Sequence, residues 1–281
     1  MTNRVQGAAR SDAADGSKDL LVRREAGVLV LTFNRVEARN ALTPAMLDGL
    51  AAELAAAELD PEIGCVVLTG AGAAFCAGGD VKAQAAGNAS GNTPNPILRM
   101  ERQRQSQRAT SLRLYQMSKP TIAALPGAAA GAGFSLALAC DMRIAADTAT
   151  MTTAFAKVGL TGDYGGTYLL TQIVGTAKAR ELYLLADRVD MAEALRLGMV
   201  NWVVPAAQLE AKTMEIARRL ASGPRIAQGL IKDNLNRALK SGLADCLDME
   251  SANLAEARKT DDHKEAARAF VEKRAPIFKG R

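Results

Sequence analysis

Only one histidine stands among the 281 residues of this sequence, and its scarcity narrows the chemistry that the chain can perform. A histidine-rich metal site is excluded, and a serine–histidine–aspartate triad would depend on that single residue. His263 lies in a charged run near the C-terminus, so we interpret it as a surface residue. We therefore expect the chemistry to come from carboxylates, backbone amides or a cofactor.

Paired cysteines and strong net charge are also lacking. The four cysteines form no Cys-x-x-Cys pair and no secretory pattern, which is typical of reduced thiols in a cytoplasmic protein. The net charge is +5 and aromatic residues make up 4% of the chain, so we expect no nucleic-acid partner. The arginine-rich stretch 99–108 is interpreted as a solvated helix face, with a basic rim for a small phosphorylated ligand as the alternative.

No long apolar run of the kind that spans a membrane occurs. The longest uncharged run, 120–140, is mostly alanine and glycine and is interrupted by Pro126 and Gly127. A strand, a turn and a buried helix of small residues explain it better, and we expect no membrane association.

The order of apolar and glycine-rich segments predicts an α/β protein. Residues 1–19 are small and polar, which indicates a disordered extension. Residues 20–205 alternate short buried strands with helices, which is typical of parallel crossovers. Residues 206–281 are predicted to be a helical C-terminal region with little β-branching.

Two glycine-rich turns, 70–80 and 126–133, each follow a predicted strand and lead toward a predicted helix. Amides at a helix N-terminus lack intrahelical partners and can bind an anion. The amides of Gly79 and Ala132 are therefore candidates to hold one oxygen atom, whereas Asp80 is interpreted as a helix cap. A dinucleotide fingerprint, a P-loop and a Ser135 nucleophile each lack a required partner residue.

Five segments, 34–42, 74–82, 126–141, 159–167 and 270–278, resemble in sequence and order the crotonase superfamily of enoyl-CoA hydratases and isomerases. The resemblance covers about residues 20–278. It implies a ββα spiral core, a helical C-terminal trimerisation region, and a homotrimer or a dimer of trimers. It also implies an acyl-CoA substrate, with coenzyme A as part of that substrate and with no metal or permanent cofactor.

The same resemblance assigns roles to individual residues. The amides of Gly79 and Ala132 would form an oxyanion hole for the thioester carbonyl, in which two preorganised donors stabilise an enolate. Backbone around Ala38 and Ala77 would bind the CoA arm. Two C-terminal residues, Phe278 and Lys279, would lie near that arm.

The acid–base residues depart from the family pattern. The two glutamates that the hydratases use are replaced by Ser135 and Phe155, neither of which is a general base. Asp163 remains, and it resembles an aspartate that related isomerases use alone; the alternative is that Asp163 caps the helix expected near residue 165. A base at that helix end would need burial, against Phe155 and Tyr164, to hold its pKa up.

We therefore predict a proton-shifting CoA-thioester isomerase in which Asp163 is the acid–base group. An enoyl-CoA hydratase with relocated acid–base groups is one alternative. A crotonase-fold protein that binds CoA or RNA without catalysis is the other. The segment 83–110 is expected to line the acyl pocket, and its lack of pattern leaves the acyl group open.

Overall fold

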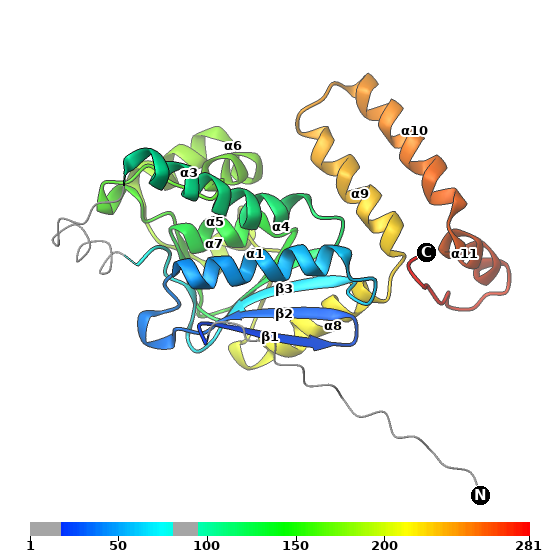
Figure 1. Ribbon diagram of the computed structural model, residues 1–281, viewed down its shortest axis with the longest axis horizontal. Helices are drawn as coiled ribbons and strands as arrows, with labels where there is room; N and C mark the ends of the chain where they lie inside the picture. Colours follow the sequence, from blue (N-terminus) through cyan, green and yellow to red (C-terminus); the bar gives the residue numbers. More distant parts are fainter. Residues whose placement is uncertain (1–17, 81–94) are drawn as a thin grey trace, which may run out of the picture.

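The computed structural model describes residues 18–80 and 95–281 (Figure 1). The extension expected at 1–19 lies outside the described residues, apart from its last two. Residues 83–94 of the segment expected to line the acyl pocket lie outside them as well.

A large sheet of apolar strands forms the centre of the molecule. Its order is β1-β2-β3-β5-β7-β10, in which β1 and β2 form an antiparallel hairpin and every other pair is parallel. The central strands read as continuous apolar runs because helices cover the sheet. The bounds are β1 Leu20–Glu25, β2 Val28–Phe33, β3 Cys65–Gly70, β5 Thr121–Leu125, β7 Met142–Ala146 and β10 Trp202–Val204.

A second, smaller sheet arises from segments that the sequence did not identify as strands. Its order is β4-β6-β8-β9, with bounds Ala74–Cys76, Ala128–Ala130, Thr150–Thr152 and Val189–Asp190. Strands β4 and β6 lie inside the two segments predicted to be glycine turns, so a strand replaces three residues of each predicted turn, and α5 also begins inside the second one. Pairing of β4 with β6 brings the two turns that follow these strands side by side.

The first long helix begins where local signals place it. Thr43 caps α1 by accepting a hydrogen bond from the Met46 N–H at 3.1 Å, and Pro44 is the first helical residue. The described helices are η1 Val36–Ala38, α1 Pro44–Leu59, α3 Pro96–Gln107, η2 Arg108–Leu112, α4 Arg113–Gln116, α5 Ala132–Ala139, η3 Ala156–Val158, α6 Gly166–Leu185, α7 Met191–Arg196, η4 Ala206–Gln208, α8 Leu209–Ala221, α9 Arg225–Ala238, α10 Leu243–Lys259 and α11 Asp261–Val271.

The layers place α5 at the centre of the fold. Helix α8 packs against β2, β3, β5 and β7, whereas α1 packs against β1, β2 and η2. Every residue of α5 is buried, in contact with the small sheet, η2 and α6. Small residues in α5 permit this close packing, as the sequence predicts.

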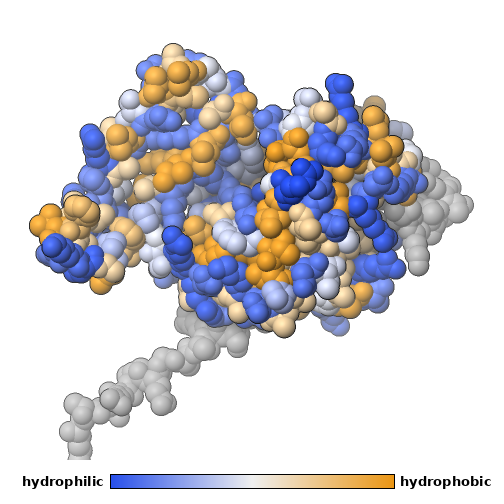
Figure 2. Space-filling model, turned by 180° about the vertical axis from the view of Figure 1, so that it is seen from behind, coloured by the Kyte–Doolittle hydropathy of each residue, from blue (hydrophilic) through white to orange (hydrophobic). Residues whose placement is uncertain are grey.

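After β10 the chain is helical, as expected, and α9 and α10 form a pair that projects from the core (Figure 1). Lys232 anchors α9 by donating to Asp141 Oδ2 at 2.8 Å and to Leu114 O at 2.9 Å. Many apolar side chains of α9, α10 and α11, which together we call the C-terminal arm, are exposed, and they appear as orange patches in Figure 2. They include Ile231, Leu235, Leu239, Leu243, Leu247, Leu254, Phe270 and Val271.

Candidate active site

The two glycine-rich turns touch each other at the carboxyl ends of β4 and β6. A Cβ atom on Gly133 would lie 2.4 Å from Cys76 O, and one on Gly78 would lie 3.2 Å from Ala132 N. Gly78 also has a φ of +91°, which a side chain would strain. Glycine at these positions therefore lets the backbone of residue 79 approach the start of α5.

The amides of Gly79 and Ala132 have no acceptor in the part of the chain that the structure describes. Ala132 is the first residue of α5, so its N–H is one of the unpaired donors of a helix N-terminus. The carbonyls just before the two amides are held in place: Gly78 O accepts from the Leu42 N–H at 2.8 Å, and Gly131 O from the Ser135 N–H at 3.1 Å. Two fixed donors at adjoining turns suit a developing negative charge on an oxygen atom.

Asp163 lies in the segment before α6 and is half-buried. Its Oδ2 accepts from Gln103 Nε2 at 3.4 Å, and its buried Oδ1 has no hydrogen-bond partner among the described residues. Burial raises the pKa of this carboxyl from its ordinary value of 3.8 to about 6. The carboxylate can therefore exchange a proton near neutral pH.

The alternative role of Asp163 as a helix cap is wrong. The N-cap residue of α6 is Gly165, which has a φ of +76°, and no side chain caps this helix. Only the backbone carbonyl of Asp163 contributes there, by accepting from the Gly166 N–H at 3.1 Å. The side chain therefore makes no capping hydrogen bond that would lower its pKa.

Residues of α3 and η2 hold the Asp163 segment in place, and the sequence did not reveal them. Tyr164 has a φ of +50°; its N–H donates to Gln107 Oε1 at 3.2 Å, and its carbonyl accepts from Ser111 Oγ at 2.5 Å. Tyr164 OH also forms a 3.4 Å hydrogen bond with Ser106. Part of the stretch read as a solvated arginine-rich face thus supports the candidate acid–base residue.

Aromatic rings link Asp163 to the glycine turns. The rings of Phe155 and Tyr183 stack in parallel with centroids 6.2 Å apart, and Phe155 lies against Gly131. The Asp163 charge adds to burial in raising the pKa of Tyr183, and likewise that of Cys76, which reaches about 12. Asp163 therefore lies near both turns, and Cys76 is a buried thiol packed between them.

The two residues expected at the CoA arm, Ala38 and Ala77, lie at the same edge. Ala77 donates its N–H to Arg39 O at 3.0 Å, which places the segment around Ala38 beside the first glycine turn. Fully buried Asn40 fixes this segment, because its Nδ2 donates to Ala71 O and Ala74 O. Nothing in the sequence pattern distinguished Asn40 from an ordinary turn residue.

The chain does not bring Phe278 and Lys279 to this edge. They lie beyond α11, where the Lys279 N–H donates to Asp262 Oδ1 at 2.6 Å, near the C-terminal end of α1 (Figure 1). The glycine turns lie near the other end of α1, and its 16 residues span about 24 Å. Within one chain these two residues and the turns are therefore far apart.

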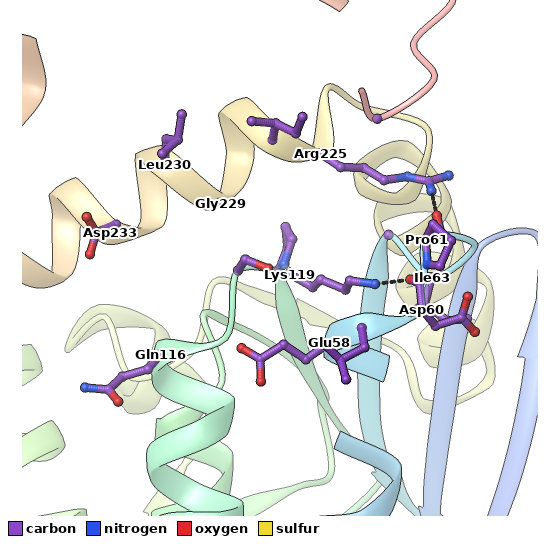
Figure 3. A pocket seen from close by; sticks show the side chains of 16 residues that line it. Glu58, Asp60, Pro61, Ile63, Gln116, Lys119, Arg225, Gly229, Leu230 and Asp233 are labelled. Carbon is purple, nitrogen blue, oxygen red and sulfur yellow. Dashed lines mark hydrogen bonds between the residues drawn. The ribbon is translucent and has the colours of Figure 1, made fainter. Parts of the chain in front are cut away.

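A cavity of about 470 Å³ opens between α9 and the end of α1 (Figure 3). It lies where β3 and β5 begin, whereas ligands of parallel sheets bind at the carboxyl ends. Lys119 and Arg225 line it, but both donate to backbone carbonyls, of Asp60 and Pro61. It contains none of the predicted site residues, so we do not regard it as the active site.

Other predictions concern single residues. Asp80 pairs with Arg35 at 3.2 Å, and the helix that it was expected to cap lies outside the described residues. His263 is exposed on α11, as expected. Across residues 18–80 and 95–281, no three His, Cys, Asp or Glu side chains are grouped to hold a metal ion, and no helix is long and apolar enough to cross a membrane.

Comparisons with known proteins agree with this geometry. A family model described as enoyl-CoA hydratase/isomerase matches residues 23–281. The chain is 39% identical to the 1,2-epoxyphenylacetyl-CoA isomerase of Escherichia coli K12, over 93% of this chain and 98% of the relative. It is 35% identical to the short-chain-enoyl-CoA hydratase of Clostridium acetobutylicum, over 91% and 95%.

A solved structure of an enoyl-CoA hydratase from Polaromonas sp. JS666 superimposes with a TM-score of 0.86, at 34% identity, over 92% of this chain and 99% of that one. The chain belongs to the enoyl-CoA hydratase/isomerase family of the crotonase superfamily. The expected α/β crotonase fold with a helical C-terminal region is thereby confirmed, and an enzyme acting on CoA thioesters follows from the family.

Proposed function

We propose that the protein is a proton-shifting acyl-CoA isomerase. The thioester oxygen accepts hydrogen bonds from the Gly79 and Ala132 amides, which stabilise the enolate that forms when a proton leaves the acyl chain. Asp163 takes that proton as a carboxylate and returns it to another carbon. The same carboxyl serves as base and then as acid, so no second titratable side chain is needed.

The state of Asp163 carries this proposal. Its carboxyl combines a pKa raised to about 6 with a buried oxygen that has no hydrogen-bond partner among the described residues. A general acid–base group is most effective when its pKa lies near the working pH. Burial rather than a second carboxylate causes the shift, which suits a mechanism with one carboxylate.

Hydration would require another acid–base group, and the chain offers little choice. Between residues 81 and 117 the sequence contains one acidic residue, Glu101, which bonds with Arg104 and Gln105 of its own helix. The two hydratase glutamate positions hold Ser135 and Phe155. Ser135 Oγ lies 2.3 Å from where a Cβ on Gly166 would stand, so the site is closely filled there.

Turnover by an Asp163→Asn variant tests the proposal. We expect wild-type protein to convert a 3-enoyl-CoA to its 2-enoyl isomer, and the variant to lose about 10²–10⁴-fold in kcat. Asp187→Asn, which changes an exposed aspartate, is the matched control. Variant activity equal to wild type would remove Asp163 from the mechanism, and loss of enoyl absorbance from crotonyl-CoA would favour the hydratase.

The acyl group is proposed to come from fatty-acid or aromatic-acid breakdown. The likeness to 1,2-epoxyphenylacetyl-CoA isomerase supports the aromatic branch, because the acyl group in that relative's name carries a phenyl group. Relative kcat/KM values for a panel of straight-chain and aryl CoA thioesters distinguish the two branches.

We further propose a homotrimer or a dimer of trimers. The exposed apolar residues of α9–α11 support association, because monomers seldom expose so large an apolar surface. In such an assembly Phe278 and Lys279 could contact the CoA arm of a neighbouring copy rather than of their own. Light scattering gives the mass, and Phe278→Ala should raise KM for acyl-CoA while leaving kcat close to wild type.

A further inference from the structure

The peptide group that carries the Ala132 N–H has a second hydrogen-bonding end. Its carbonyl oxygen, Gly131 O, accepts two hydrogen bonds from one residue: the Ser135 N–H at 3.1 Å and the Ser135 hydroxyl at 3.3 Å. The backbone bond is the ordinary first bond of α5. The hydroxyl bond is additional and comes from a side chain that the sequence could change.

Hydrogen bonds in series strengthen one another, because each polarises the next group. A donor on a peptide carbonyl draws electron density from the nitrogen and makes the N–H of the same peptide a stronger donor. The equivalent carbonyl at the other turn, Gly78 O, accepts from the backbone N–H of Leu42 and, among residues 18–80 and 95–281, from no side chain. Ser135 is therefore the one side chain acting on either donor peptide within the described residues.

We propose that Ser135 is a positioning residue of the oxyanion hole, whose hydroxyl fixes and polarises the Gly131–Ala132 peptide so that the Ala132 N–H binds the thioester oxygen more strongly. This inference rests on the proposed role of Ala132 and deepens it. It gives a function to the residue that stands where the hydratases carry a glutamate.

The surroundings of Ser135 hold its hydroxyl in this position. The side chain is fully buried on α5, so water does not compete for the bond. Ser135 Oγ and Tyr183 OH lie 2.3 and 2.4 Å from the position that a Cβ on Gly166 would take, so both hydroxyls fill the space that this glycine leaves. The Ser135 hydroxyl also lies near enough to Tyr183 OH to act against burial on the pKa of that phenol, but the hydrogen bond that the serine side chain donates in this structure is the one to Gly131 O.

The same kind of bond elsewhere in the chain provides a control. A serine in a helix often donates its hydroxyl to the carbonyl four residues earlier, with no functional consequence. Ser251 in α10 makes such a bond, to Leu247 O at 2.8 Å, on the exposed surface. Ser251→Ala is therefore a matched control for Ser135→Ala, because the same kind of bond is removed away from the turns.

The experiment is isotope-edited infrared spectroscopy of butyryl-CoA, labelled with carbon-13 at the thioester carbonyl and bound to each protein. In wild-type protein we expect the carbonyl band below its position in free butyryl-CoA. In Ser135→Ala the carbonyl band should move part of the way back toward its position in free butyryl-CoA, and in Ser251→Ala it should stay at the wild-type position. In parallel, kcat on a 3-enoyl-CoA should fall about 3- to 10-fold in Ser135→Ala, as for the loss of one neutral hydrogen bond, with KM within about 2-fold.

The outcomes separate this inference from the proposed function. A band that responds to Ser135→Ala in a protein that does not isomerise 3-enoyl-CoA supports the role of Ser135 and refutes the isomerase. An unchanged band and kcat in Ser135→Ala overturn the role of Ser135 and leave the isomerase standing. A wild-type band at the free position overturns both. Thermal unfolding of each variant shows whether a change reflects lost folding instead.

Discussion

Replacing Asp163 by asparagine should make the protein inactive and, above pH 6, more stable. The carboxyl has a pKa raised from 3.8 to about 6 by burial, so its ionised form is less favourable in the folded state than in the unfolded state. A raised carboxyl pKa costs no stability below about pH 4, where both states are protonated. The cost grows between pH 4 and 6 and is complete above pH 6.

The magnitude follows from the pKa shift. A difference of about two pH units at about 1.4 kcal/mol each gives at most about 3 kcal/mol, reduced by the partial exposure of the side chain. Asparagine resembles the protonated acid in shape and can still accept from Gln103. Asp163→Asn should therefore match wild type at pH 4 and exceed it by about 1–3 kcal/mol at pH 7.5.

Chemical denaturation at pH 4 and pH 7.5 measures the difference directly, with the same protomer concentration in each sample. Asp187→Asn is again the control, because its side chain is 73% exposed and its only described ion pair, with Lys157, spans 3.7 Å. A surface change of this kind should alter stability by less than about 1 kcal/mol. An Asp163→Asn effect that is equal at both pH values, or destabilising at pH 7.5, would refute the argument that burial raises the pKa.

Three further predictions concern the candidate active site and the C-terminal arm. In wild-type protein kcat/KM should rise with pH along an acid limb near pH 6, as Asp163 ionises, and a pH–rate profile without that limb would contradict its role as base. Gly133→Ala should lower kcat at least about 10-fold and lower the free energy of unfolding by about 1–3 kcal/mol, because the added Cβ would stand 2.4 Å from Cys76 O. This clash exceeds the gain of about 1 kcal/mol that alanine brings in helix propensity. Steady-state kinetics measure the first effect and urea unfolding the second. Lys232→Met should cost about 3 kcal/mol, because the half-buried Asp141 carboxylate would lose its cationic partner and keep only its hydrogen bonds from Thr121. Urea unfolding would detect this loss, and an unchanged midpoint would exclude the anchor.

The sequence predicted elements with strong local signals. Two β-rich apolar runs predict the hairpin, Thr43 followed by Pro44 predicts the start of a helix, and small residues after the second glycine turn predict a buried helix that ends near Cys140; the structure contains all three. The three-residue strand β6 was missed because it consists of alanine, which carries little strand preference, and β4 (Ala-Phe-Cys) was missed because the glycines on both sides of it indicate a turn. Their pairing depends on contacts between segments about 50 residues apart, which local patterns do not encode.

The sequence likewise predicted the site residues that lie in motifs, but not the contacts that surround them. Motifs indicated Gly79, Ala132 and Asp163, and the structure places their segments close together. The raised pKa of Asp163 depends on burial by residues scattered over the chain. The sequence showed only that the proposed mechanism needs a raised pKa, and not that the fold provides one. Tyr183 and the α3 contacts carried no motif, because their role arises only from the tertiary packing.

The measurement that tests the account most directly is a crystal structure of the protein with a bound, unreactive acyl-CoA thioester. We predict the thioester oxygen within about 3 Å of both the Gly79 and the Ala132 nitrogens, and the Asp163 carboxyl beside the carbon that loses its proton. A thioester oxygen bound elsewhere, or an Asp163 carboxyl turned away from the acyl chain, would contradict the mechanism.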